Sequence, residues 1–149
     1  MAYKPENYQD VIANMTFKDS EKAAEFYAQA LNAKDIQIMK SEDGSWVMHG
    51  NMKIGDSVIF FNDENDMMPR KAPSGPVPIA FYIYVEDVDA AYQQAVKNGM
   101  QSIFEPQDMF WGDRTAVVVD PFHYTWTFST QTRQVSDADL EEGRKSFGN

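Results

Sequence analysis

Apolar residues recur at helical spacing in two segments of the chain. In residues 19–31 they occupy positions i, i+3, i+4, i+7 and i+8, as Ala23, Phe26, Tyr27, Ala30 and Leu31. In residues 87–99 the same spacing is filled by Val88, Ala91, Tyr92, Ala95 and Val96. Such a stripe is typical of one buried helix face. Asp19 and Asp87 stand where an N-cap belongs, and Gly99 can end the second helix. The pattern therefore predicts two helices.

Short segments rich in β-branched and aromatic residues surround these helices and are typical of strands. In chain order they are residues 10–17, 36–39, 46–53, 57–62, 78–85, 101–104, 115–119 and 124–129. Polar turns at residues 42–44 and 54–56 favour antiparallel hairpins. Each half of the chain therefore follows the order strand, helix, strand, strand, strand, which indicates one supersecondary unit used twice.

The length of 149 residues suits a single domain, residues 1–149, with internal modules. We place module one at residues 8–63, a polar linker with Pro and Gly at 64–76, and module two at 77–131. A peripheral helix is expected at 136–147, because Ser136 stands three residues before Asp139, as in a capping box. This tail could pack on a neighbouring subunit or fray.

The composition narrows the range of partners. The formal net charge is −10, and no stripe of Lys and Arg is present, so nucleic-acid binding is not expected. No apolar run approaches the ~18 residues of a membrane span. The first ten residues have no signal-peptide core, and the chain has no cysteine, so we expect a cytoplasmic protein without disulfides. The acidity fits a cationic ligand, although solubility alone also accounts for it.

Five segments carry a resemblance to a known superfamily: KDSEKAAEFYAQAL, MHGNMKIGDSVIFFND, YIYVEDVDAAYQQAV, MFWGDRTAVVVDPF and YTWTFSTQTRQVS. In this order they resemble the vicinal oxygen chelate superfamily, which includes glyoxalase I, bleomycin-resistance proteins and extradiol dioxygenases. The PhnB-like branch is the most similar. The resemblance implies an α+β fold of two βαβββ modules, whose mixed sheets curl around a cavity, usually in a homodimer.

The resemblance also locates the metal ligands of metal-using members. Two of these ligands lie seven residues before the helix-capping Asp residues, and a third lies seven residues after the Asp of the Asp-Pro turn. In this chain the three positions are occupied by Ile12, Ala80 and Thr127. The matching strand of module one offers Ile59 or Phe60. Divalent metals need imidazole, carboxylate or amide donors. We therefore predict no metal and no other cofactor, and expect the last strand of module two to wall a cavity.

Two histidines have different expected roles. His49 is the candidate catalytic residue, because PhnB-like sequences often carry His here and an imidazole can transfer protons near neutral pH. The alternative is an edge-strand imidazole bonded to the backbone. His123 replaces the Gly usual in relatives after Asp-Pro-Phe, which indicates an exposed turn residue with positive φ.

Further candidates line the expected cavity. Phe110, Trp111 and Arg114 could form a loop over its mouth, with aromatic stacking and a contact to an acidic ligand. Alternatively, Trp111 plugs the barrel end, while Asp113 and Arg114 tie the loop to the sheet.

Strand alternation adds more residues to this set. If position 12 faces the cavity, so do Asn14 and Thr16; if position 80 does, so do Tyr82 and Tyr84. Asn14, Tyr82 and Thr127 are therefore candidate ligand contacts. An internally satisfied polar core is the competing interpretation.

Three functions remain open from the sequence. The first is a metal-free protein that binds or sequesters an aromatic or cationic small molecule, as bleomycin-resistance proteins do. The second is a glyoxalase-like lyase or isomerase, using a divergent metal or His49 as acid/base. The third is a dimer without a ligand. No G-x-S-x-G, H-E-x-x-H, Walker or dinucleotide motif supports another chemistry.

Overall fold

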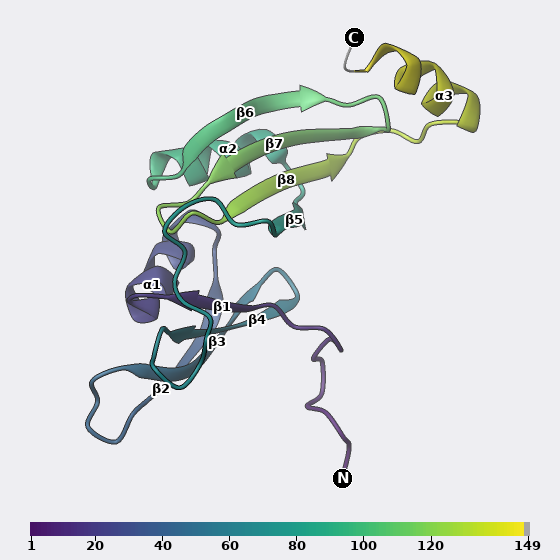
Figure 1. Ribbon diagram of the computed structural model, residues 1–149. Helices are drawn as coiled ribbons and strands as arrows, with labels where there is room; N and C mark the ends of the chain where they lie inside the picture. Colours follow the sequence, from purple (N-terminus) through teal and green to yellow (C-terminus); the bar gives the residue numbers. More distant parts are fainter. Residues whose placement is uncertain (148–149) are drawn as a thin grey trace. The chain divides into compact units, whose positions relative to one another are not determined.

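The structure is a computed structural model that describes residues 1–147, so the last two residues of the predicted domain, Gly148 and Asn149, lie outside the described part. The chain forms two compact units, Met1–Gly75 and Pro76–Asn149. Each unit repeats the order strand, helix, strand, strand, strand (Figure 1). Each sheet has four strands and mixes parallel with antiparallel pairing. The predicted α+β fold of two βαβββ modules is confirmed.

The first unit contains β1 (Asn14–Phe17), α1 (Ser20–Ala30), β2 (Lys34–Lys40), β3 (Val47–Ile54) and β4 (Ser57–Asp63). Its sheet order is β1-β4-β3-β2, in which β1 runs parallel to β4 and the other neighbours are antiparallel. The carboxylate of Asp19 accepts from the N–H of Lys22 at 3.1 Å and so caps α1, as the sequence predicts. The expected first strand, 10–17, is shorter and begins at Asn14.

The core of the first unit lies between α1 and one face of this sheet. Phe17 and Tyr27 are fully buried and meet edge to face, with ring centroids 6.0 Å apart. Asp63, at the end of β4, accepts from the N–H of Ser20 at 2.7 Å and from that of Val47 at 2.8 Å. Asp63 therefore ties the first turn of the helix and the start of β3 to one strand end.

The second unit contains β5 (Ala80–Tyr84), α2 (Val88–Lys97), β6 (Gln101–Asp108), β7 (Asp113–Val119), β8 (Thr125–Gln131) and α3 (Asp137–Ser146). Its sheet order is β5-β8-β7-β6, with β5 parallel to β8. Asp87 caps α2 by accepting from the N–H of Ala90 at 3.1 Å. β6 runs four residues beyond the expected 101–104, through Pro106, which an edge strand tolerates because one side of it needs no ladder bond.

The turn between β7 and β8 is organised by Asp120. Its Oδ1 accepts from the N–H of Phe122 at 2.9 Å and of Tyr124 at 3.0 Å. Its Oδ2 accepts from Nε1 of the buried Trp126 at 2.9 Å. His123 is exposed with φ 77°, so the predicted turn conformation at this residue is confirmed.

The C-terminal helix α3 begins with the capping box expected from the sequence, in which Ser136 and Asp139 bond each other's backbone N–H. None of its residues is buried. It approaches the loop between β6 and β7, where a Cβ built on Gly143 would lie 2.5 Å from the side chain of Phe110. Within residues 1–147, every helix is too short or too polar to cross a bilayer.

Gly50 provides a test of packing in the first unit. A Cβ at this position would lie 2.1 Å from Cε2 of Phe61, a fully buried ring on the neighbouring strand. We expect Gly50→Ala to lower the free energy of unfolding by about 1–3 kcal/mol, because the ring has no room to move aside. Urea unfolding measures the loss. Gly75→Ala is the matched control, since nothing lies within 4 Å of a Cβ there. Equal stability of the two variants would contradict the packing argument.

Candidate functional site

Each sheet has one face that carries its helix and one opposite face, which we call the open face. In the second unit, Arg114 bonds Asp89 of α2, so the side chain of Arg114 is on the helix face. Because side chains alternate along a strand, Asp113 and Thr115 belong to the open face. In the first unit, Phe17 packs on Tyr27 of α1, so Thr16 belongs to the open face. The candidate ligand contacts separate along this division.

The open face of the second sheet brings together residues from three strands. Cross-strand register pairs Tyr82 of β5 with Thr127 of β8, and Tyr84 with Ser129. Ser129 in turn pairs with Thr115 of β7. Two candidate ligand contacts from the sequence, Tyr82 and Thr127, are therefore direct neighbours. Ala80 lies on the same face, two residues before Tyr82.

Asp113 is the centre of a hydrogen-bonded network on this face. The carboxylate is buried, with 6% exposure, and its Oδ2 accepts from the Tyr84 hydroxyl at 3.1 Å and from the Ser129 hydroxyl at 2.9 Å. Ser129 is itself fully buried and accepts from the Tyr82 hydroxyl at 3.3 Å. The two tyrosines are 52% and 67% exposed. The network thus connects a buried carboxylate to two rings at the surface.

The Asp113 carboxylate also affects the phenol that donates to it. The hydrogen bond from Tyr84 to Asp113 raises the pKa of Tyr84, because loss of the proton would place two negative charges side by side. Sequence reasoning missed this role of Asp113 and grouped the residue with Arg114. Alternation along β7 is the signal that separates them, since consecutive residues face opposite sides of a sheet.

Arg114 is held by two carboxylates on the helix face. Its Nε and Nη2 bond the two oxygens of Asp89 at 2.8 and 3.0 Å, and its Nη1 bonds Asp108 at 3.3 Å. The hydrogen bonds that Arg114 donates to Asp89, and further to Asp108, raise the pKa of Arg114. The bond between Arg114 and Asp89 also lowers the pKa of Asp89. Arg114 therefore links α2 to β7 and β6, and an acidic ligand would compete with both carboxylates for it.

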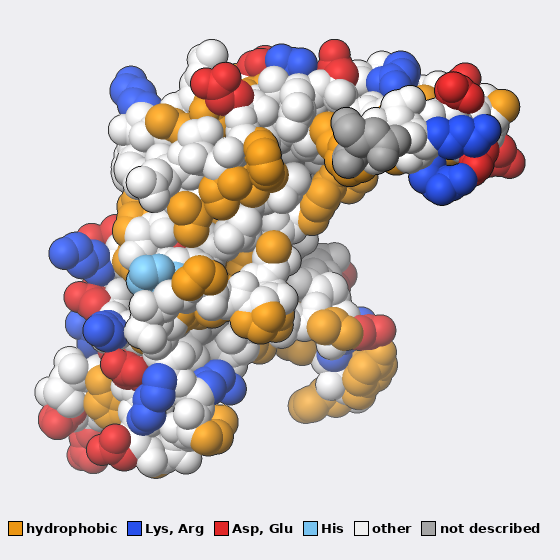
Figure 2. Space-filling model, turned by 45° about the horizontal axis from the view of Figure 1, so that its top comes forward, with side chains coloured by type: hydrophobic (Ala, Val, Ile, Leu, Met, Phe, Trp, Pro, Cys, Tyr) orange, Lys and Arg blue, Asp and Glu red, His pale blue; other side chains and the backbone are white. Residues whose placement is uncertain are grey.

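Phe110 and Trp111 form an aromatic cluster with the C-terminal end of the chain. Their ring centroids are 5.0 Å apart, and the ring of Phe147 lies 5.4 Å from Phe110 and 6.0 Å from Trp111. Large apolar side chains elsewhere in this unit are exposed, among them Ile79, Tyr82, Tyr84, Ile103 and Phe104. Figure 2 shows hydrophobic side chains gathered in a band on the surface of this unit.

The open face of the first sheet carries His49 and Asn14. The ring of His49 meets that of Phe60 edge to face, with centroids 4.7 Å apart. Asn14 is exposed and pairs in register with Phe60. Within the described part of the chain, His49 has neither a hydrogen bond to the backbone nor an acid that orients its ring. The catalytic role of His49 stays a prediction, and so does the alternative of an imidazole bonded to the backbone.

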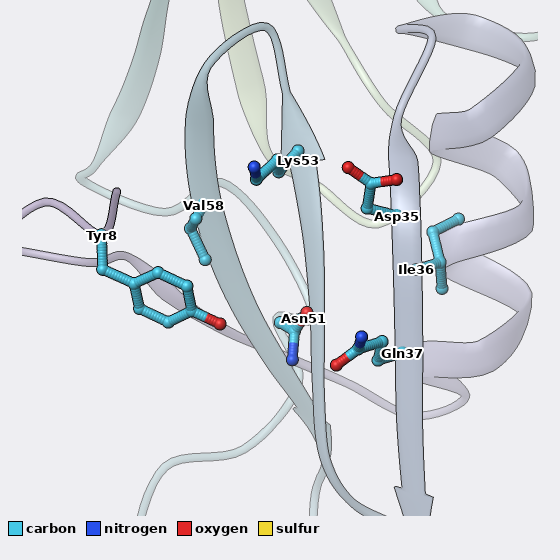
Figure 3. A pocket seen from close by; sticks show the side chains of 7 residues that line it. All are labelled: Tyr8, Asp35, Ile36, Gln37, Asn51, Lys53 and Val58. Atoms are coloured by element: carbon cyan, nitrogen blue, oxygen red, sulfur yellow. The ribbon is translucent and has the colours of Figure 1, made fainter. Parts of the chain in front are cut away.

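A hollow of about 370 Å³ lies on the same unit, a size within the roughly 300–1,000 Å³ of small-molecule pockets. Its lining residues are Tyr8, Asp35, Ile36, Gln37, Asn51, Lys53 and Val58. Gln37 and Asn51 are register partners on β2 and β3, and Figure 3 shows the Tyr8 hydroxyl directed toward Asn51. Sequence reasoning missed this hollow, because Tyr8 meets the strands only after folding.

Arg70 adds a cation to the open face of the first sheet. It lies in the segment predicted as a linker, yet its Nε donates to Oγ1 of Thr16 at 2.9 Å and its Nη2 donates to Oδ1 of Asn62 at 3.2 Å. Thr16 and Asn62 are register partners on β1 and β4 and are 3% and 6% exposed. No local sequence signal marks Arg70 as part of a site.

The residues at the superfamily's metal positions do not fit a divalent ion. Ile12 and Ala80 carry no donor atom, and Thr127 offers only a neutral hydroxyl. Among residues 1–147, no group of three His, Asp or Glu side chains is arranged to hold a metal ion. The absence of a cofactor stays a prediction.

Known structures share this fold. TioX from Micromonospora sp. ML1 matches with a TM-score of 0.64 and 15% identity, over 86% of this chain and 100% of that one. The fosfomycin resistance protein FosX from Listeria monocytogenes matches with a TM-score of 0.65 and 13% identity, over 89% and 96%. A PhnB protein from Bacillus cereus, titled a putative 3-demethylubiquinone-9 3-methyltransferase, matches with a TM-score of 0.64 and 11% identity, over 82% and 99%.

Sequence comparison identifies relatives and the superfamily. An uncharacterized protein from Mycobacterium bovis is 28% identical over 140 residues, which are 91% of each chain. A model of the Glyoxalase/Bleomycin resistance protein/Dioxygenase superfamily matches residues 10–128. That match covers most of the chain and spans both units. The chain therefore belongs to the glyoxalase/bleomycin resistance protein/dioxygenase superfamily.

Proposed function

We propose that this protein binds a small organic molecule, without a metal ion, on the open face of a sheet. The buried carboxylate of Asp113 is the observation that carries the proposal. Both hydrogen bonds that it accepts run to Oδ2, and no side chain within residues 1–147 donates to Oδ1. Among the described residues, the buried side-chain atom without a hydrogen-bond partner is Ser20 Oγ, so Oδ1 of Asp113 keeps contact with solvent. A donor on a ligand can therefore reach Oδ1 and form a charge-assisted hydrogen bond with it.

The neighbouring groups suggest what such a ligand looks like. The rings of Tyr82 and Tyr84 lie 5.6 Å apart and are largely exposed, so an aromatic or apolar body can stack on them. A protonated nitrogen beside these rings would gain a cation–π contact and a charge-assisted bond to Asp113. The formal net charge of −10 also attracts cations. Sequestration of an amphipathic or cationic compound is the concrete form of this function.

An enzymatic alternative has less support from the site. A lyase or isomerase that uses His49 needs a group to orient the imidazole and fix its tautomer. The His49 ring instead meets the Phe60 ring edge to face. A divergent metal would need donors that Ile12, Ala80 and Thr127 do not supply well. Binding therefore accounts for more of the geometry than catalysis does.

Two further expectations accompany this proposal. The resemblance to the superfamily favours a homodimer, and the cysteine-free composition favours the cytoplasm. Both stay predictions.

Calorimetric titration with a panel of glycopeptides and aromatic amines tests the binding function. We expect at least one compound to bind more tightly than millimolar, which corresponds to about 4 kcal/mol. Asp113→Asn should weaken that binding roughly tenfold or more, because it removes the charged acceptor. Asp108→Asn is the matched control, since Asp108 bonds Arg114 on the helix face. Binding that is absent throughout the panel, or insensitive to Asp113, would refute the proposal.

Metal dependence can be tested directly on the purified protein. We expect elemental analysis to find less than stoichiometric zinc, iron, manganese, nickel and copper, because the donor positions hold Ile12, Ala80 and Thr127. Treatment with a chelator should leave ligand affinity unchanged. One tightly held ion per chain, with loss of binding on its removal, would show that the metal-free assignment is wrong.

The Tyr84–Asp113 bond predicts an alkaline dependence of stability. A tyrosine whose folded pKa is raised stabilises the fold fully below its unfolded pKa of about 10, and this stabilisation is lost as pH rises through the folded value. In Asp113→Asn the pKa of Tyr84 should fall toward about 10, since the carboxylate is gone. The pKa of Tyr84 is measured from the absorbance of tyrosinate as a function of pH, after the titration of the Tyr84→Phe variant is subtracted. An unchanged titration would contradict the bond.

A further inference from the structure

We infer that Arg70 forms an anion-binding subsite on the open face of the first sheet, suited to a carboxylate or phosphate group of a small molecule. The inference deepens the proposed binding function and rests on it. It goes beyond the Asp113 network, because it concerns the other unit and the opposite ligand charge.

The guanidinium of Arg70 uses only one of its edges. The bonds to Thr16 and Asn62 come from Nε and Nη2, which form the side edge of the group. A guanidinium has five N–H donors in a planar fork. The end edge, made by Nη1 and the remaining hydrogen of Nη2, is therefore left for another acceptor. Its two parallel N–H groups match the two oxygens of a carboxylate or phosphate.

The partners of Arg70 hold it without neutralising it. Thr16 and Asn62 are uncharged, so the full positive charge of the guanidinium is retained. Asn62 is itself fixed, because its Nδ2 donates to the carbonyl oxygen of Asp63 at 2.8 Å. Both partners are buried side chains on strands of the sheet. The cation is thus preorganised, which lowers the entropy cost of binding an anion.

Two of the other three arginines have carboxylate partners, while Arg133 donates to the backbone carbonyl oxygens of Met109 and Phe110. Arg114 bonds Asp89 and Asp108, and Arg144 bonds Glu141. Within residues 1–147, no carboxylate forms an ion pair with Arg70. This is notable in a chain with 23 acidic and 13 basic residues, where acidic partners are plentiful.

The carboxylates nearest in sequence to Asn62 are occupied elsewhere. Asp63 accepts from the N–H groups of Ser20 and Val47. Glu64 accepts from the N–H of Ala72 at 3.2 Å. These acids stabilise the backbone of the first unit and leave the charge of Arg70 uncompensated. Arg70 is exposed, so an anionic group on a ligand can reach it from solvent.

Titration followed by NMR, with three probes of similar shape, tests the subsite. The probes are benzoate, phenylphosphonate and the neutral benzamide, and the readouts are the Arg70 Nε–H signal and the Asn62 side-chain amide signals. We expect one or both anions to shift these signals saturably and to bind roughly tenfold or more tightly than benzamide, because a bidentate charged contact is stronger than a neutral one. The better of the two anions identifies the group.

Variants separate the charge from the fold. Arg70→Gln should remove the preference for anions, and Arg70→Lys should keep part of it, since a point charge lacks the fork. Asn62→Asp keeps Arg70 but places a carboxylate beside it, and should also remove the preference. Arg144→Gln removes the same charge from an exposed pair with Glu141 and should change nothing. Thermal unfolding and amide spectra establish that each variant is folded.

The outcomes distinguish the two proposals. If benzamide binds the open face as tightly as the anions do, or if Arg70→Gln keeps the preference for anions, the subsite is refuted while the binding function stands. If no probe binds the first unit while the panel of aromatic amines binds through Asp113, the subsite is again refuted alone. If no compound in either experiment binds, both proposals fail.

Discussion

One helix can cover only one face of a four-stranded sheet, and each unit of this protein supplies one helix to its sheet. The helix face becomes the core, where Phe17 packs on Tyr27 and Gly50 leaves room for Phe61. Strand alternation then sends every second side chain to the open face. Polar residues buried on that face must find partners there, because the helix cannot reach them. The candidate site follows from this division of each sheet.

The two open faces satisfy their polar groups in opposite ways. The second sheet buries a carboxylate, Asp113, under hydroxyl donors from Tyr84 and Ser129. The first sheet holds a guanidinium, Arg70, on neutral acceptors. In each case the charged group keeps hydrogen-bonding capacity beyond its partners in the fold. Arg114, which serves the fold, instead has its charge paired with two carboxylates.

Aspartates perform much of the structural work that leaves the open faces available for a ligand. Asp19 and Asp87 cap the two helices. Asp63 joins the ends of three elements, and Asp120 fixes the last hairpin through Trp126. In the caps, the short carboxylates of Asp19 and Asp87 reach backbone N–H groups three residues ahead, whereas Asp63 bonds N–H groups that are distant in sequence. Part of the acidity of the chain is therefore structural, and only part is available to attract a cationic ligand.

The sequence by itself determined the helices, their caps, the turn at His123 and the repeated βαβββ order, because these depend on contacts within a few residues. Alternation also placed Asn14 with Thr16, and Tyr82 with Tyr84, on common faces. Only the tertiary structure decided which partners the charged side chains take. Arg70 reaches Thr16 across 54 positions and Tyr84 reaches Asp113 across 29. Such pairings depend on strand register and on how a loop folds back over a sheet, and no local spacing encodes them.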